Sequence, residues 1–145
     1  MLKKIGAVAI SAFFVGLLFL LVKSGIGSGS DSSSSVVIKG EKFSVEVANT
    51  PVKKLIGLAG RKSLGENEGM IFPFSSQTTP IFWMKGMLIP IDIIWLSGGK
   101  IVGFEENAEP EGNKIDSNLK VYRPEEPIDS VLEVVAGTVS RLGIQ

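Results

Sequence analysis

The feature that most constrains the fold is an apolar stretch at the centre of the chain, Pro80–Leu96, which contains both tryptophans, Trp83 and Trp95. Its two strongly apolar runs are Ile81–Met84 and Ile91–Leu96. Neither run alternates between apolar and polar residues, which is typical of strands that are buried on both faces. We therefore expect two buried strands here, with the core of the protein around them.

Short strands are also predicted on either side of this centre. Phe43–Ala48 alternates strictly between apolar and polar residues, so we expect a half-buried strand that forms a hairpin with Val36–Ile38. A second hairpin is expected between Ile91–Leu96 and Ile101–Phe104, because glycine-rich turn residues separate them. Further strands are predicted at Gly69–Phe74, Val121–Tyr122 and Val131–Val135.

Helices are predicted to be few and short. Thr50 is a good N-cap and Pro51 suits the first helical position, and the apolar residues that follow have helical spacing: Val52, Leu55 and Ile56. A final helical turn is expected at residues 137–142, with Gly143 following it. The fold class is therefore β-rich α+β. We expect a compact, mainly antiparallel barrel or sandwich of about seven short strands with one or two short helices.

The N-terminal residues 1–23 are predicted to anchor the chain in a membrane. Lys3 and Lys4 precede an uncharged apolar run, Ile5–Val22, which is long enough as a helix to cross roughly 27 Å of bilayer. An uncleaved signal anchor is favoured, and a cleaved signal peptide stays open as the alternative. The lysines place the N-terminus in the cytoplasm and the rest of the chain outside it, as a single-pass protein of the cell membrane.

Residues 24–35 are almost wholly glycine and serine and predict a flexible linker with a reach of roughly 20 Å. The globular domain is then expected to be residues 36–145. From residue 36 onward the chain has 12 lysines and arginines against 14 aspartates and glutamates, a net charge of −2. No nucleic-acid partner is expected, since such proteins carry a basic patch.

The chain contains neither cysteine nor histidine. This excludes disulfides, thiol catalysis, Cys/His zinc sites and a Ser-His-Asp triad. We expect no cofactor and no metal ion.

Two motifs occur together in the apolar centre, Phe82-Trp83-Met84-Lys85 and Ile89-Pro90-Ile91-Asp92-Ile93-Ile94. They are accompanied by Phe43–Ala48, Thr50, Gly57-Leu58, Arg61, Gly69–Phe72, Val131–Val134 and Gly137. In this combination the sequence resembles domain of unknown function family 192. The likeness covers the chain from about Phe43 to the end. The resemblance implies a compact β-rich domain of prokaryotes, often secreted or membrane-tethered, with no settled activity.

Two charged residues stand out in the apolar centre, Lys85 and Asp92. Asp92 lies between two isoleucines, and a buried carboxylate must be paired, hydrogen-bonded or protonated. Lys85 and Arg61 are its candidate partners. Asp92 is either a structural carboxylate that binds a cation or loop amides, or a group that contacts a ligand; Trp83 is either core or a binding platform. The candidate ligand-binding residues are Arg61, Trp83, Lys85 and Asp92.

Two classes of function follow. The first is a non-catalytic, membrane-tethered extracytoplasmic module that binds a small polar molecule, a glycan or a partner protein. The alternative is a carboxylate-dependent hydrolase acting on an extracytoplasmic substrate such as a glycan, with Asp92 paired with Glu105 or Glu106. That chemistry requires the two carboxyl groups to lie roughly 5–10 Å apart across a cleft. The binding module is the favoured hypothesis.

Overall fold

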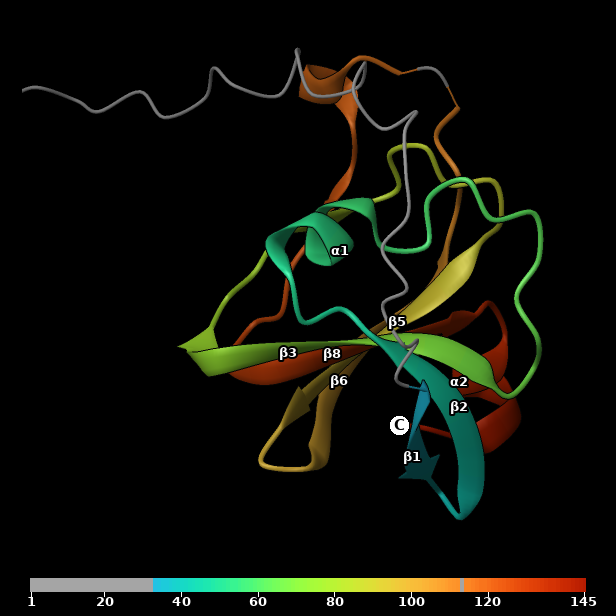
Figure 1. The fold of residues 1–145 in the computed structure, drawn as a ribbon, viewed down its shortest axis with the longest axis vertical. Coiled ribbons are helices and arrows are strands. Elements are labelled where there is room, and N and C mark those ends of the chain that lie inside the picture. Colours follow the sequence, from blue (N-terminus) through green and yellow to red (C-terminus); the bar gives the residue numbers. More distant parts are fainter. Residues whose placement is uncertain (1–32, 113) are drawn as a thin grey trace, which may run out of the picture. The chain divides into compact units, whose positions relative to one another are not determined.

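The computed structural model describes residues 33–112 and 114–145 (Figure 1). The elements are β1 (Ser33–Ile38), β2 (Glu41–Val47), α1 (Pro51–Ile56), β3 (Glu68–Thr78), β4 (Phe82–Trp83), β5 (Ile91–Ser97), β6 (Lys100–Ala108), a 3₁₀ turn η1 (Asp116–Asn118), β7 (Val121–Tyr122), β8 (Ile128–Val135) and α2 (Thr138–Leu142). The predicted membrane segment, residues 1–23, lies outside the described residues. Within the described ranges, no helix has the length and apolar character needed to cross a bilayer.

Six strands form one sheet in the order β1-β2-β3-β8-β5-β6, and β4 pairs with β7 in a separate two-stranded sheet. Neighbouring strands are antiparallel except β2 and β3, which are parallel and are joined through α1. Parallel neighbours need such a crossover, because the chain must return to the same end of the sheet. The prediction of a mainly antiparallel β fold with two short helices is confirmed, with eight strands instead of about seven.

The prediction of a closed barrel, one of the two architectures expected from the sequence, is wrong. The six-stranded sheet is open, with β1 at one edge and β6 at the other. The reason lies in the central strands, since every residue of Ile91–Leu96 in β5 is buried. Strands buried on both faces need cover on both sides of the sheet, and here each face has its own apolar cluster.

The two clusters follow the alternation of side chains along each strand. Ile93 and Val131 belong to one cluster, with Met70 and Phe72 of β3. Their neighbours Ile94 and Leu132 belong to the other cluster, with residues of β2 and α2. The first face is covered by α1, the residues that follow it, and the β4–β7 pair. Figure 1 shows α1 lying over β3 and β8 on this side.

The predicted hairpins β1–β2 and β5–β6 are confirmed by their pairing, and α2 ends as expected at Gly143, whose φ is +59°. Strand β4 is the exception among the central runs. It is only two residues long, and Ile81 and Trp83 are 50% and 43% exposed. The expectation that this run is buried on both faces is therefore wrong. Among the described strands, β4 pairs with the two-residue strand β7 and no second strand covers its other edge.

Helix α1 begins as predicted, since the Thr50 hydroxyl accepts a hydrogen bond from the Lys53 amide at 3.2 Å and Pro51 is the first residue. Its apolar residues do not point into the core: Val52, Leu55 and Ile56 are 57%, 58% and 54% exposed. Their helical spacing therefore does not mark a face buried in the core, and Leu55 and Ile56 instead line a pocket beside α1.

Candidate functional site

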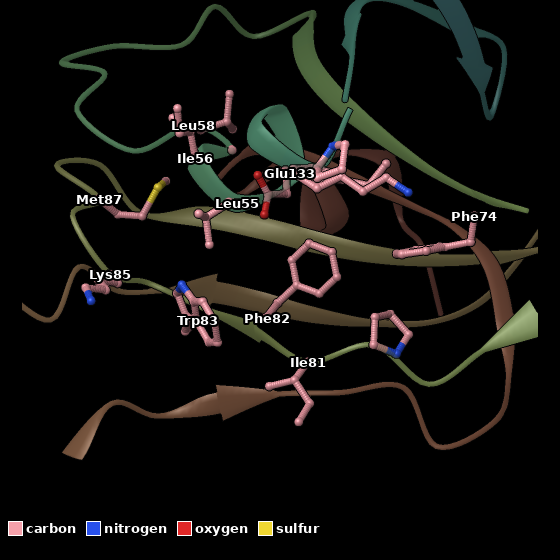
Figure 2. Close-up of a pocket in the computed structure, with 15 residues that line it drawn as sticks. Leu55, Ile56, Leu58, Phe74, Ile81, Phe82, Trp83, Lys85, Met87 and Glu133 are labelled. Carbon is pink, nitrogen blue, oxygen red and sulfur yellow. The ribbon is translucent and has the colours of Figure 1, made fainter. Parts of the chain in front are cut away.

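A pocket with a volume of about 290 Å³ lies on the α1 side of the sheet (Figure 2). Its walls come from α1 and the residues after it, from β3 and from β4 with its flanking segments. Most of the lining is apolar: Pro51, Leu55, Ile56, Gly57, Leu58, Phe72, Phe74, Pro80, Ile81, Phe82, Trp83 and Met87. The charged lining residues are Lys54, Lys85 and Glu133. Small-molecule sites typically have this combination of apolar walls and a few polar groups.

Glu133 lies on the central strand β8, where Met70 of β3 and Ile93 of β5 are its neighbours in the sheet. Its side chain is 6% exposed. The oxygen Oε2 is fully buried and has no hydrogen-bond partner among the described residues. In Figure 2 the carboxyl of Glu133 lies among the lining residues, near Leu55 and Phe82. A buried polar group without a partner is rare and destabilises the fold, so it is a candidate for binding something else.

Burial raises the pKa of the Glu133 carboxyl from 4.5 to about 8. The cause is desolvation alone: the low-dielectric surroundings disfavour the charged form, and no neighbouring cation opposes this effect. The carboxyl is therefore mostly protonated and neutral at pH 7. Titratable groups with strongly shifted pKa values are concentrated at functional sites.

Aromatic contacts hold the pocket walls in place. The ring of Phe72 meets that of Phe82 edge-on, with centroids 5.2 Å apart and planes at 86°. Phe82 in turn meets the core residue Trp95 at 5.7 Å and 63°. Gly57 lies at the same wall with a φ of +53°, a conformation that favours glycine. A Cβ there would lie 3.5 Å from the Phe72 ring and 3.7 Å from Glu133 Oε2, so the missing side chain leaves room above the carboxyl.

The mouth of the pocket is apolar and exposed, since Leu55, Ile56, Ile81 and Trp83 are each 43–58% exposed. Contiguous exposed apolar surface of this kind is typical of binding sites. The two lysines at the pocket have partners of their own. The Lys54 ammonium donates to the Pro73 carbonyl and lies 4.3 Å from the centre of the Phe74 ring.

The Lys85 ammonium is 2.6 Å from Asp116, on the 3₁₀ turn. Of the four predicted ligand-binding residues, the structure thus places Trp83 and Lys85 at the pocket. Arg61 does not line it and instead forms an ion pair with Glu46 at 2.5 Å. Lys85 is not the partner of Asp92.

Asp92 is fully buried on the opposite face of the sheet from Glu133. Its two carboxylate oxygens accept backbone hydrogen bonds from Asn107 and Val139, each 2.8 Å long. The pairing of β5 with β6 shifts register beside Asp92, and Asn107 has a positive φ of +51°, which presents its N–H to the carboxylate. Asp92 therefore connects the end of β6 to the start of α2.

The hydrolase hypothesis requires Asp92 to face a cleft together with Glu105 or Glu106, which lie on the neighbouring strand β6. Asp92 is sealed in the core and does not line the pocket. Glu106 lies on β6, and its carboxylate accepts a hydrogen bond from the Ser140 hydroxyl of α2 at 2.6 Å. A carboxyl group that is closed to solvent cannot meet a substrate, so the geometry gives the hydrolase hypothesis no support.

The family model of DUF192, described as "Uncharacterized ACR", matches residues 34–145. The chain belongs to the DUF192 family. This confirms the resemblance stated from the sequence. The family description assigns no activity, and a comparison with curated proteins found no match.

Two solved structures resemble this DUF192 domain, each with a TM-score of 0.66. One is a protein from Sinorhizobium meliloti described as a candidate transcription regulator; it is 31% identical, and the match covers 77% of this chain and 84% of that chain. The other is a protein of unknown function from Novosphingobium aromaticivorans; it is 27% identical, and the match covers 84% of this chain and 95% of that chain. Neither description indicates an enzymatic activity.

Glu133 is the residue of this DUF192 pocket that sequence reasoning missed. The signal was available, because Glu133 stands inside the apolar run Val131–Val135, just as Asp92 stands inside Ile91–Leu96. The sequence analysis singled out Lys85 and Asp92 as the charged residues of the apolar centre and did not include Glu133. A carboxylate in a fully apolar strand is worth marking wherever it occurs, since each one needs a partner.

Proposed function

We propose that this DUF192 domain is a binding module whose pocket takes a small ligand with an apolar body and one hydrogen-bonding group. The observation that carries the proposal is the buried carboxyl of Glu133 at the base of an apolar pocket, whose Oε2 has no hydrogen-bond partner within residues 33–112 and 114–145. A ligand group that hydrogen-bonds Oε2 would remove the cost of leaving that atom unpaired. The apolar walls would bury the remainder of the ligand.

The arrangement supports a preformed site. Phe82 is held between Phe72 and Trp95, so the wall needs little rearrangement to accept a ligand. The exposed residues Leu55 and Trp83 stand at the mouth, where they would close over the ligand body. This proposal narrows the expectation from the sequence, because the lining favours a largely apolar molecule over a glycan or another strongly polar ligand.

The place of the module in the cell is part of the proposal. The apolar run Ile5–Val22, with its preceding lysines, would tether the domain to the membrane and place it on the extracytoplasmic side. A nucleic-acid-binding role, which the description of the Sinorhizobium meliloti protein raises, has no support in the charge of this domain. The net charge from residue 36 onward is −2, with 12 basic and 14 acidic residues.

The test is a ligand screen on the full chain in nanodiscs, followed by intrinsic tryptophan fluorescence. Trp83 lines the pocket and Trp95 contacts its wall, so occupancy should change their emission. Small aromatic and aliphatic molecules with a single polar group form the screen. Saturable binding is expected, with empty nanodiscs as the blank for partition into lipid.

Two substitutions on α1 locate the binding. Leu55→Arg places a long side chain at the pocket and should abolish binding, while the matched control Val52→Arg, equally exposed but outside the lining, should retain it. Binding that survives Leu55→Arg would place the ligand elsewhere. A screen in which nothing binds saturably would refute the proposed function.

A further inference from the structure

We infer that the pocket binds a small organic cation, an amine, amidine or guanidine on an apolar body, with the Glu133 carboxylate as its anionic partner. This inference rests on the proposed function and names the chemical class of the ligand. Three observations support it: the acidic group at the base of the pocket, the absence of a basic partner for that group among the described residues, and the aromatic surface around it.

The chain supplies no counter-charge for Glu133 among the described residues. From α1 only Lys54 lines the pocket, and its ammonium is bound to the Pro73 carbonyl and the Phe74 ring. From the segment after β4 only Lys85 does so, and its ammonium is paired with Asp116.

The strands on either side of β8 add no charge. They place Met70 and Ile93 beside Glu133, which do not titrate. Arg61, the nearest basic residue after α1 in the chain, is paired with Glu46 and does not line the pocket. In the part of the chain that the structure describes, the base of the pocket thus presents one acidic group and no basic group to a ligand.

The shape of the site suits a cation bound through N–H groups. The carboxyl faces the pocket (Figure 2), and a planar amidine or guanidine can donate two parallel hydrogen bonds to its two oxygens. Aromatic rings line the same space at Phe72, Phe74 and Phe82, and ring faces attract cations. The Phe74 ring already has the Lys54 ammonium 4.3 Å from its centre. An anionic ligand would instead meet a carboxyl at the base.

The protonation of Glu133 predicts the direction in which the affinity for a cation changes with pH. A cation binds the ionised carboxylate, whereas the free site holds a proton up to a pKa of about 8. At pH 7 only about a tenth of the sites are ionised, and at pH 9 about nine tenths are. The apparent dissociation constant for a cation should therefore fall about tenfold from pH 7 to pH 9. A neutral ligand that accepts a hydrogen bond from the protonated carboxyl shows the opposite trend.

The experiment uses three probes of nearly the same shape: benzamidine, a cation; benzamide, which is neutral; and benzoate, an anion. Each is titrated calorimetrically into the full chain in phosphatidylcholine nanodiscs at pH 7 and pH 9, with empty nanodiscs subtracted. Benzamidine should bind more tightly than the other two at pH 9, and about tenfold more tightly than at pH 7. Glu133→Gln should remove both the preference and the pH dependence, whereas Glu126→Gln, which removes an exposed carboxylate that does not line the pocket, should retain them.

The failures are distinguishable. Binding of benzamide or benzoate as tight as that of benzamidine at pH 9 would overturn this inference and leave the proposed function standing. Benzamidine binding that is unchanged in Glu133→Gln, or equally weakened in Glu126→Gln, would also overturn it, because the attraction would then be to the surface charge. No binding of any of the three probes at either pH would overturn the inference, and if the broader screen also fails, the proposed function with it.

Discussion

The buried carboxyl of Glu133 should make the folded domain lose stability as pH rises. The folded state holds the proton up to a pKa of about 8, and the unfolded chain releases it near 4.5. The stability linked to this proton is therefore complete below pH 4.5 and is lost as pH rises to about 8. Each pH unit inside that window costs about 1.4 kcal/mol of unfolding free energy, so the step from pH 5 to pH 9 should cost at most about 4 kcal/mol. A domain of this size has only about 5–15 kcal/mol in total.

The perturbation that isolates this effect is Glu133→Gln, which keeps the shape of the side chain and cannot ionise. Urea unfolding of both proteins, followed by tryptophan emission at pH 5, 7 and 9, gives the difference between their unfolding free energies at each pH. That difference should shift in favour of the glutamine variant by up to about 4 kcal/mol between pH 5 and pH 9.

Titrations elsewhere in the chain are common to both proteins and cancel in this comparison. The control Glu126→Gln, at an exposed position, should follow the wild type. Parallel pH dependence in wild type and Glu133→Gln would show that the carboxyl ionises as it does in water, and the reasoning about its burial would fail.

Two further predictions test the frame that holds the pocket. Asp92→Asn replaces one acceptor oxygen with an N–H donor that faces a backbone N–H. In a thermal melt it should destabilise the domain by about 1–3 kcal/mol, while the ligand affinity of the pocket stays unchanged. A stable variant that has lost binding would contradict the structural role of Asp92. Gly69→Ala should destabilise the domain far more than the control Gly65→Ala. A Cβ at Gly69 would lie 2.5 Å from the Glu133 carbonyl oxygen, whereas a Cβ at Gly65 would meet only the flexible Glu68 side chain at 3.0 Å. Equal melting temperatures for the two variants would refute the close packing of β3 on β8.

The local structure of this domain could be predicted where short-range rules decide it. The Thr50-Pro51 start of α1, the two hairpins and the end of α2 at Gly143 were all predicted, because caps and turns depend on neighbouring residues. The parallel pairing of β2 with β3 could not be predicted from the sequence, because it depends on where distant strands insert into the sheet. The exposure of Leu55 and Trp83 was missed because apolar spacing does not distinguish a core from a pocket wall.

Asp92 and Glu133 show which part of the site could not be predicted: the sequence reveals both charges within apolar runs, but not which of them has a partner in the fold. Both are carboxylates in strands that are otherwise apolar, and both are buried on adjacent strands of one sheet. Only the Asp92 carboxylate has hydrogen-bond partners among the described residues, because the two side chains face opposite sides of that sheet.

On the side of Asp92, the β6 bulge and the start of α2 supply two backbone amides, from residues 15 and 47 positions away in the chain. On the side of Glu133, α1 and β4 supply apolar walls and leave the carboxyl without a partner in the described structure. A satisfied carboxylate holds the fold together, whereas an unsatisfied one at the base of a pocket costs stability that a bound ligand can restore. The second carboxylate is therefore the position at which the function of this DUF192 domain should be sought.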